Sequence, residues 1–239
     1  MKICILQPNY IPWIGYFELI KFSNAFIFLD DVQYTKRDWR NRNYINLNNK
    51  KYLLSIPVIT KGRFNQKINE VKFFSQNFKE NHLKLIKNAY FKSKYFDEIY
   101  PILRNTYNKD DNNLLSNFNI NLIKVFSKYL KLNTNFFKSS DFKINLSSNK
   151  KLVEICKVIN ADIYLSGKKA LNYLDESAFN QAKIKLKIVD YKNQKNYSNP
   201  KKNFIEKLSL IDLMFNQGPN SLNYLQDLNL LSYHEALSN

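Results

Sequence analysis

Polar side chains follow three short apolar segments of the chain, and their types suit chemistry on an anionic substrate. Gln7 follows the segment KICIL, Asp30 and Asp31 follow AFIFL, and Ser166 and Gly167 follow DIYL. Carboxylates act as general bases or hold Mg²⁺, and a glutamine amide both donates and accepts hydrogen bonds. A Ser–Gly turn exposes backbone N–H groups that can bind an anion. These residues are therefore candidates for a site, with Gln7, Asp30 and Asp31 as its catalytic groups.

The loop over residues 32–43 is the second candidate feature, because it combines arginines with aromatic side chains. It holds three of the few arginines of a chain whose basic residues are mostly lysines. Arginine forms paired hydrogen bonds with phosphate or carboxylate, and Trp or Tyr offers a face on which a base or sugar can stack. We predict that nine residues of this loop bind substrate: Gln33, Tyr34, Lys36, Arg37, Trp39, Arg40, Asn41, Arg42 and Asn43.

Both features also have structural interpretations. Aspartates that follow strands often form turns or cap helices. The loop could equally be solvated, with its aromatic side chains tucked into the core. Asn216 is a further candidate for substrate binding, because the end of its predicted helix is unusually polar, although that helix otherwise looks structural.

Composition excludes several classes of protein. Two cysteines and two histidines among 239 residues cannot form a disulfide scaffold, a four-thiolate metal site or a His-rich metal centre. With four glycines, the chain has no glycine-rich phosphate loop. We expect a reduced, soluble, cytoplasmic protein without a membrane span or signal peptide. No metal site is assigned and the cofactor is unknown, with Mg²⁺ on the aspartate pair left open.

The chain is strongly basic, with 37 Lys and Arg against 20 Asp and Glu, a formal net charge of +17. Such a charge attracts anionic partners: nucleic acid, a nucleotide or another phosphorylated small molecule. The excess is mostly lysine, however, in a chain also rich in Asn, Ile and Tyr, which is what an AT-rich genome supplies. The charge therefore indicates a class of partner without choosing one.

A βαβ unit at the start of the chain must position the first two strand ends. Residues 2–6 are an apolar run ended by Pro8, residues 13–22 have helical spacing, and residues 25–29 are a second apolar run. A unit of this length makes its two strands parallel. If DIYL joins the same sheet in parallel, all three polar ends meet at its carboxyl edge, where ligands of open α/β sheets bind.

The rest of the chain predicts a β-hairpin, a helical middle segment and further strands. The hairpin strands are 44–47 and 52–56, the helices are 78–90, 95–107, 114–132 and 151–159, and the later strands are 162–165 and 185–189. A polar linker is expected at 138–150, a basic loop at 191–202, and a last helix from Ser209, capped with Asp212, to Gly218-Pro219. We expect an α/β fold with a parallel or mixed sheet, as one domain over 1–239 with 78–132 as a helical insertion or subdomain.

The opening of the chain resembles the WbqC-like protein family. The stretches LQPNYIPWIGYFELI and FIFLDDVQYTKRDWRNRNYI match the family patterns Q-P-x-Y-x-P-x-x-G-Y-F and D-D-V-Q-Y-x-K-x-x-W-x-N-R. Later, ADIYLSG, NYL and LSLIDLMFNQGP look like its second and third signatures, so the resemblance runs to about residue 219. The turn in SGKKALNYL departs from the smaller Gly- or Ala-rich turn expected there.

The resemblance implies a bacterial protein, similar to proteins encoded beside genes for O-antigen and other surface-polysaccharide sugars. It carries the family motif onto Gln7, Pro8, Tyr10, Pro12, Gly15, Tyr16, Asp30, Asp31, Gln33, Tyr34, Lys36, Trp39, Asn41 and Arg42. That set overlaps the strand ends and the loop described above. Around the first strand end, we therefore expect substrate contacts from Pro8, Asn9, Tyr10, Trp13, Gly15 and Tyr16.

A looser likeness connects the first 30 residues with nucleotidylyltransferases of the HUP class. This chain and that class share the order of a strand, a proline, a Gly-Tyr pair early in a helix and a second strand. Trp13 and Tyr16 stand where that pattern has two histidines, so the imidazoles that stabilise phosphate are missing. The likeness is a fold-level analogy, which implies nucleotide-type binding without nucleotidyl transfer.

We interpret the sequence as a transferase, with acyl or aminoacyl transfer preferred, that acts on an activated, nucleotide-linked amino sugar for O-antigen or surface polysaccharide. Asp30 or Asp31 would be the base toward the sugar amine, and Gln7 and Asn41 would orient the acceptor. Phosphates would meet Lys36, Arg37, Arg40 and Arg42, and rings would stack on Tyr34 and Trp39. The alternatives are an RNA-binding protein, with charged tRNA as donor or ligand, and a non-catalytic component of a glycan assembly complex. The sequence does not indicate an oligomeric state.

Overall fold

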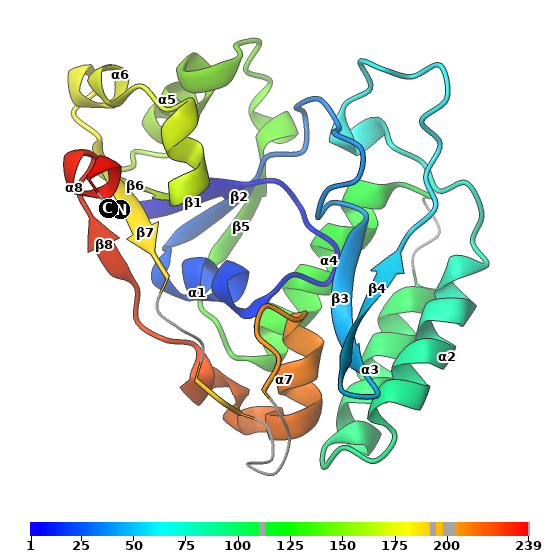
Figure 1. Ribbon diagram of the computed structural model, residues 1–239. Helices are drawn as coiled ribbons and strands as arrows, with labels where there is room; N and C mark the ends of the chain where they lie inside the picture. Colours follow the sequence, from blue (N-terminus) through cyan, green and yellow to red (C-terminus); the bar gives the residue numbers. More distant parts are fainter. Residues whose placement is uncertain (110–112, 192–194, 198–203, 239) are drawn as a thin grey trace.

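The computed structural model describes residues 1–109, 113–191, 195–197 and 204–238. In this part of the chain, six strands form one sheet flanked by helices on both faces (Figure 1). The strands are β1 (Lys2–Leu6), β2 (Ala25–Phe28), β5 (Asn135–Lys138), β6 (Ile163–Gly167), β7 (Lys185–Asp190) and β8 (Asn229–Leu231). The expected α/β class is confirmed.

The strand order is β5-β2-β1-β6-β7-β8, with β8 antiparallel to β7 and every other pairing parallel. Cys4 of β1 lies opposite Phe26 of β2 and Leu165 of β6, so the expected parallel pairing of the first two strands is confirmed. Numbered within the sheet, the order is third, second, first, fourth, fifth, sixth, which is that of doubly wound sheets. The order reverses between β1 and β6, which marks the ligand-binding crevice of such sheets.

Both faces of the sheet are buried, which explains the continuous apolar runs of its central strands. Cys4 faces a large cluster that includes α1 (Ile14–Phe22), whereas Ile3 and Ile5 face a second cluster that includes α5 (Ser148–Val158). The second face is completed by α6 (Glu176–Gln181) and α8 (Tyr233–Leu237). Each fully buried side chain of this size stabilises the fold by about 1.5–3 kcal/mol.

The helical middle segment packs against the first face of the sheet. It consists of α2 (Phe78–Tyr90), α3 (Phe96–Asn108) and α4 (Leu115–Tyr129), close to the predicted bounds. Phe17 of α1 contacts Phe126 of α4, with ring centroids 6.2 Å apart. Tyr90 stacks at 4.4 Å on Phe215 of the last long helix, α7 (Leu210–Gln217). The segment therefore shares one hydrophobic cluster with the sheet.

The predicted hairpin is confirmed as β3 (Arg42–Leu47) and β4 (Lys50–Ser55), which form a separate antiparallel pair. Its turn residues Asn48 and Asn49 have φ values of 53° and 59°, the left-handed conformation that a two-residue hairpin turn requires. The backbone N–H of Ser209 donates to Tyr44 O, which fixes β3 beside the start of α7.

Several elements differ from the sequence-based expectation. The predicted linker over 138–150 contains the end of β5, a 3₁₀ turn (Ser139–Phe142) and the first turn of α5. The strands β5 and β8 and the helices α6 and α8 were not predicted, because each is six residues or shorter and lacks a clear period. Ser209 caps α7 as expected by accepting from Ile211 N–H, but the Asp212 carboxylate accepts from the Tyr90 hydroxyl at 2.8 Å. The basic loop expected at 191–202 lies largely outside the described residues.

Three smaller elements complete the described chain: 3₁₀ turns at Ile68–Glu70, Lys168–Asn172 and Gly218–Tyr224. None of the helices within the described ranges has the length and apolar character needed to cross a lipid bilayer.

Candidate functional site

The three polar strand ends lie side by side at the carboxyl edge of the sheet. β2, β1 and β6 are neighbours and parallel, so Gln7, Asp30 and Ser166 leave the sheet at the same edge. β5 lies next to β2 and ends there too, which brings Ser139 and Ser140 beside the aspartate pair. The geometry expected from the sequence is therefore present, with a fourth strand end added.

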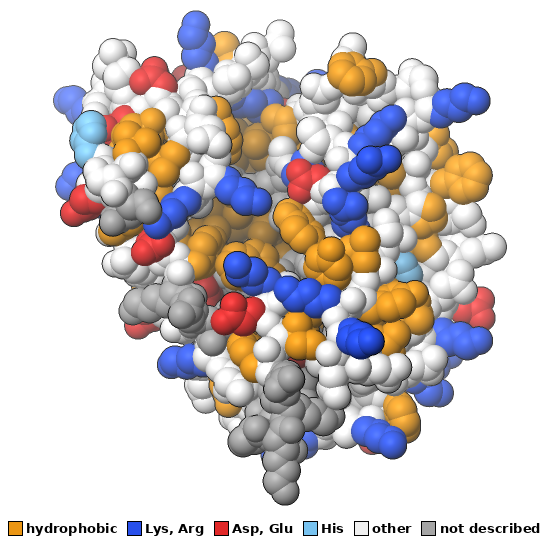
Figure 2. Space-filling view, viewed as in Figure 1, with side chains coloured by type: hydrophobic (Ala, Val, Ile, Leu, Met, Phe, Trp, Pro, Cys, Tyr) orange, Lys and Arg blue, Asp and Glu red, His pale blue; other side chains and the backbone are white. Residues whose placement is uncertain are grey.

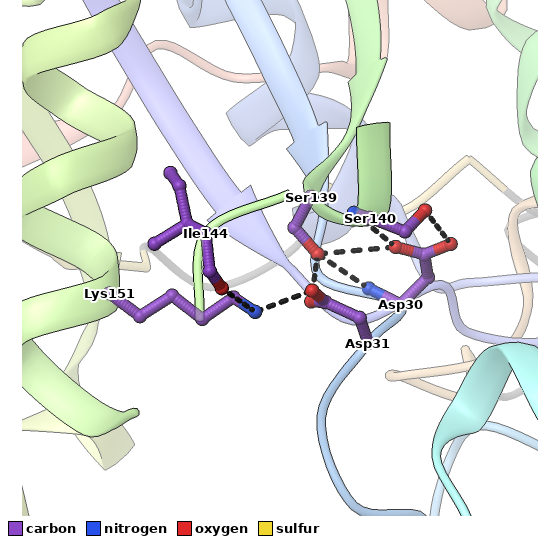
Figure 3. A network of polar contacts seen from close by, with 6 residues as sticks. All are labelled: Asp30, Asp31, Ser139, Ser140, Ile144 and Lys151. Atoms are coloured by element: carbon purple, nitrogen blue, oxygen red, sulfur yellow. Dashed lines mark hydrogen bonds and ion pairs between the residues drawn. The ribbon is translucent and has the colours of Figure 1, made fainter. Parts of the chain in front are cut away.

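Asp30 anchors the end of β5 (Figure 3). Its carboxylate accepts the Ser140 N–H at 3.0 Å and the Ser140 hydroxyl at 2.9 Å, and the Ser139 hydroxyl lies 3.2 Å away. The side chain is buried, and the Asp30 N–H donates to Ser139 Oγ. Because its oxygens are engaged by two serines, Asp30 joins β2 to β5.

Asp31 forms a nearly buried ion pair with Lys151 of α5. Lys151 Nζ lies 2.5 Å from Asp31 Oδ2, and the two side chains are 6% and 12% exposed. Ser139 Oγ lies 2.5 Å from the other carboxylate oxygen, and Ile144 O accepts from Lys151 at 3.4 Å. Figure 3 shows the Lys151 amine and the Ser139 hydroxyl both directed at the Asp31 carboxylate. Asp31 is thus held in one position while keeping a small solvent-facing surface.

The aspartate pair does not fit a Mg²⁺ ion. Mg²⁺ needs a carboxylate oxygen at close range with its remaining positions open to water or phosphate. Here the Lys151 ammonium occupies that position at Asp31, and serine groups take both oxygens of Asp30. Among the described residues, no three His, Cys, Asp or Glu side chains cluster in a way that could hold a metal.

Aromatic rings close over the start of α1. The rings of Trp13 and Tyr191 lie 4.9 Å apart, and a Cβ on Gly15 would lie 2.4 Å from the Trp13 ring and 2.8 Å from the Tyr191 ring. Only glycine therefore fits at position 15. Tyr16 is buried, and its hydroxyl donates to Gln7 O at 3.0 Å, which ties α1 to the end of β1.

A hollow with a basic rim lies on the same face. Figure 2 shows it in the middle of the view, with hydrophobic side chains on its floor and Lys and Arg side chains on its rim; the same region of Figure 1 holds α1, β1 and β2. Gln7 and Gly167 are half-buried, and a Cβ on Gly167 would meet open space. Ser166 is buried instead. Lys168 pairs with Asp190 at 2.8 Å, and this bond holds the pKa of the Asp190 carboxyl below its usual range.

Tyr10 points into the core rather than toward the hollow. It is fully buried, its hydroxyl lies 2.7 Å from His82 Nδ1, and it also hydrogen-bonds the Tyr107 hydroxyl. Burial lowers the pKa of His82 to about 4, so the imidazole is neutral near pH 7. Tyr10 and His82 therefore join the helical segment to the loop after β1.

Asparagine side chains hydrogen-bond the backbone of the loops that follow β1 and β2. Asn119 donates to Pro8 O at 2.9 Å and to Arg40 O at 2.7 Å, and Asn43 donates to Ile11 O at 2.8 Å. Asn41 donates to the Ile56 carbonyl at 2.9 Å, so it holds the hairpin. These amides fix backbone, which leaves the predicted roles of Asn41 and Asn43 at a substrate without structural support.

Arg40 is also directed inward, where it bonds Asp38 at 2.7 Å and Thr35. Burial lowers its pKa, and Asp38 opposes that shift. Tyr34 is buried beside it, and burial raises the pKa of its phenol to about 12.

Other predicted residues of the loop face solvent. They are Gln33, Lys36, Arg37 and Trp39, while Arg42 is half-buried and bonds Arg37 O. Asn216 bonds Asp212 O within its own helix, at the end of α7 that adjoins α3, so it does not join the strand ends. Asn9 is half-buried at the end of β1, and its side-chain oxygen has no hydrogen-bond partner among the described residues.

Three residues of the site were missed in the sequence: Ser139, Ser140 and Lys151. The serines follow NFFK as the other polar groups follow their strands, and this signal was available in principle. Lys151 gave no signal, because one lysine at the start of a helix is unremarkable in a lysine-rich chain.

Comparison with known proteins assigns the chain to a family. The model of the WbqC-like protein family matches residues 7–224, which include every strand end described above. The chain belongs to the WbqC-like family. Uncharacterized protein Rv1507c of Mycobacterium tuberculosis is 36% identical over 225 residues, covering 94% of this chain and 97% of that protein. No solved structure matches the chain. The resemblance read from the sequence is confirmed.

Proposed function

We propose that this WbqC-like protein is a transferase acting on an activated, nucleotide-linked amino sugar for a bacterial surface polysaccharide. Acyl or aminoacyl transfer to the sugar amine is the preferred reaction. The observation that supports this most is the Asp31–Lys151 pair, held at the carboxyl edge with one strand, β1, between it and the point where strand order reverses. The family resemblance supplies the polysaccharide context.

The nucleotide part of the substrate is assigned to the crevice between the ends of β1 and β6. Gly167 leaves open space there, and the Trp13 and Tyr191 rings provide an apolar surface beside the start of α1. Lys168 follows Gly167 and can leave Asp190 for a phosphate, which is a stronger hydrogen-bond acceptor. Gln7 orients the sugar through its amide, and the exposed Lys36 and Arg37 add positive charge.

Asp31 is the general base in this proposal, and Asp30 is its anchor. The amine nitrogen attacks the carbonyl carbon of the acyl donor, so an N–C bond forms and the C–O or C–S bond to the donor breaks. Asp31 takes the proton that the amine loses and returns it to the leaving oxygen or sulfur. Lys151 positions the carboxylate and balances its charge. Asp30 is preferred as anchor because it is buried with both oxygens bonded by serines, whereas Asp31 keeps a small solvent-facing surface.

Calorimetry with a panel of dTDP-, UDP- and GDP-linked amino sugars tests the binding step. We expect at least one to bind, and Lys168→Gln to weaken it, whereas Lys157→Gln on the outer surface of α5 leaves it unchanged. Folded protein that binds no member of the panel refutes the nucleotide-sugar version.

The catalytic role is separated from binding by the Asp31→Asn variant. Asparagine keeps the shape and one acceptor oxygen but cannot take a proton at neutral pH. We expect sugar-nucleotide binding to persist while polysaccharide modification in cells is lost. Unchanged output from Asp31→Asn would instead favour a non-catalytic component of a glycan assembly complex.

A further inference from the structure

A second surface with nucleic-acid character lies outside the strand-end site. It is formed by the segment 60–74, which follows the hairpin, and by the adjoining part of the arginine loop, residues 33–42. Gln33 donates to Phe64 O at 3.1 Å and forms a β-bridge with Lys67, so the two segments are in contact. We call this pair of segments the basic–aromatic surface.

Two phenylalanines of this surface are almost fully exposed. Phe64 is 80% and Phe74 is 77% exposed, although the segment that carries them is tied down by backbone hydrogen bonds. Phe74 N–H donates to Pro57 O, and Asn69 N–H donates to Asp30 O. The rings are therefore presented on a well-anchored backbone, and at these exposures they contribute little to the core.

Alternation along 71–74 places a lysine beside one of these rings. Val71 and Phe73 are buried and point inward, so Lys72 and Phe74 share the outer side of the strand-like segment. Near the other ring, a hollow of about 740 Å³ is lined by Phe64, Arg63, Lys72 and Leu114 among others. An apolar ring, two cations and the Glu70 carboxylate thus border one open depression, wide enough for a base and its phosphate to lie against.

The charge of the surface is one-sided. Besides the buried Arg40, segments 33–42 and 60–74 hold seven basic side chains: Lys36, Arg37, Arg42, Lys61, Arg63, Lys67 and Lys72. The acidic residues of the two segments are Asp38 and Glu70, and each has a partner nearby. Asp38 forms an ion pair with Arg40, and the Glu70 carboxylate accepts the Lys67 N–H at 2.8 Å.

We propose that the basic–aromatic surface binds single-stranded nucleic acid. Bases would stack on Phe64 and Phe74, and phosphates would pair with Arg63 and Lys72, the combination of rings and cations that single strands recognise. Phe64, Arg63 and Lys72 border the same hollow, and rings beside cations match the alternating bases and phosphates of a single strand. A membrane surface is the alternative occupant, and the vesicle measurement below tests it. The residues that carry the inference, Phe64, Phe74, Arg63 and Lys72, lie outside the proposed catalytic site, so it does not rest on the transferase proposal.

Fluorescence anisotropy with the full chain tests this inference. The probes are a labelled oligouridylate of about 12 nucleotides, its deoxy counterpart, the matching RNA duplex and free UMP. We expect the single strands to bind more tightly than the duplex and UMP. With about four phosphates contacted, affinity should fall roughly 50-fold between about 50 and 200 mM salt. Equal affinity for duplex and single strand, or affinity insensitive to salt, overturns the proposal.

Variants separate stacking from general charge. Phe64→Ala and Phe74→Ala should each weaken binding about 5- to 150-fold, and Phe64→Trp should retain it. Phe91→Ala is the matched control, because Phe91 is also exposed but lies at the end of α2. Arg63→Gln and Lys72→Gln should each reduce the salt slope by about 0.7. Circular dichroism checks folding. Unchanged affinity in both alanine variants, or binding to anionic vesicles without binding to oligonucleotides, refutes the inference.

Discussion

Breaking the buried ion pair of the candidate site should destabilise the protein strongly. Lys151→Met keeps the aliphatic length of the lysine but leaves Asp31 with one partner, the Ser139 hydroxyl. Removing one member of a buried pair typically costs about 3–5 kcal/mol. Because Asp31 is 12% exposed and keeps Ser139, we expect the low end, about 3 kcal/mol.

Urea unfolding followed by circular dichroism measures this change. With an m value of about 3 kcal/mol per M for a chain of this size, the midpoint should fall by about 1 M. Lys157→Met is the matched control on the same helix. Its side chain is 54% exposed and pairs loosely with Glu154 at 3.6 Å, so the free energy of unfolding should change by less than about 0.5 kcal/mol.

The double variant Asp31→Asn with Lys151→Met supplies the refuting result. If the cost of Lys151→Met comes from the uncompensated carboxylate, neutralising Asp31 should recover about half of it or more. Equal losses for Lys151→Met and Lys157→Met would show that the pair contributes no more than a surface contact. A double variant as unstable as the sum of both singles would likewise contradict the coupling.

Two further predictions concern the surroundings of the site. Gly15→Ala forces a Cβ against the Trp13 and Tyr191 rings and should lower the free energy of unfolding by about 1–3 kcal/mol. Gly167→Ala faces open space and should be nearly neutral in the same urea experiment. Equal effects of the two variants would refute the close-contact explanation. Burial lowers the pKa of His82 to about 4, so the folded protein protonates this imidazole at a lower pH than the unfolded chain does. The free energy of unfolding should therefore fall by about 3 kcal/mol in total as pH drops from about 6.5 to 4. Unfolding curves at several pH values should show a smaller dependence of this free energy on pH in His82→Asn. An unchanged dependence would assign the effect to other groups.

The candidate site shows where sequence patterns are informative and where they are not. Polar residues at the ends of apolar runs located Gln7, Asp30 and Ser166 at one edge, because parallel strands of a doubly wound sheet all end on the same side. The same patterns could not tell which groups would point inward. Tyr10, in the loop after β1, and Arg40, in the loop after β2, are buried, since the helical segment and the hairpin cover these loops.

The sequence by itself determined the longer local elements and the βαβ start of the protein, because helical and strand periods record which side of a segment is buried. It also carried the family likeness, through short motifs of fixed spacing. Tertiary structure alone decided the partners of Asp31 and Asp30. Lys151 and Ser139 lie more than 100 residues away along the chain, and they meet the aspartates only because β5 pairs with β2 and α5 packs on the second face of the sheet. Such pairings depend on how whole surfaces fit together, and no local pattern encodes them.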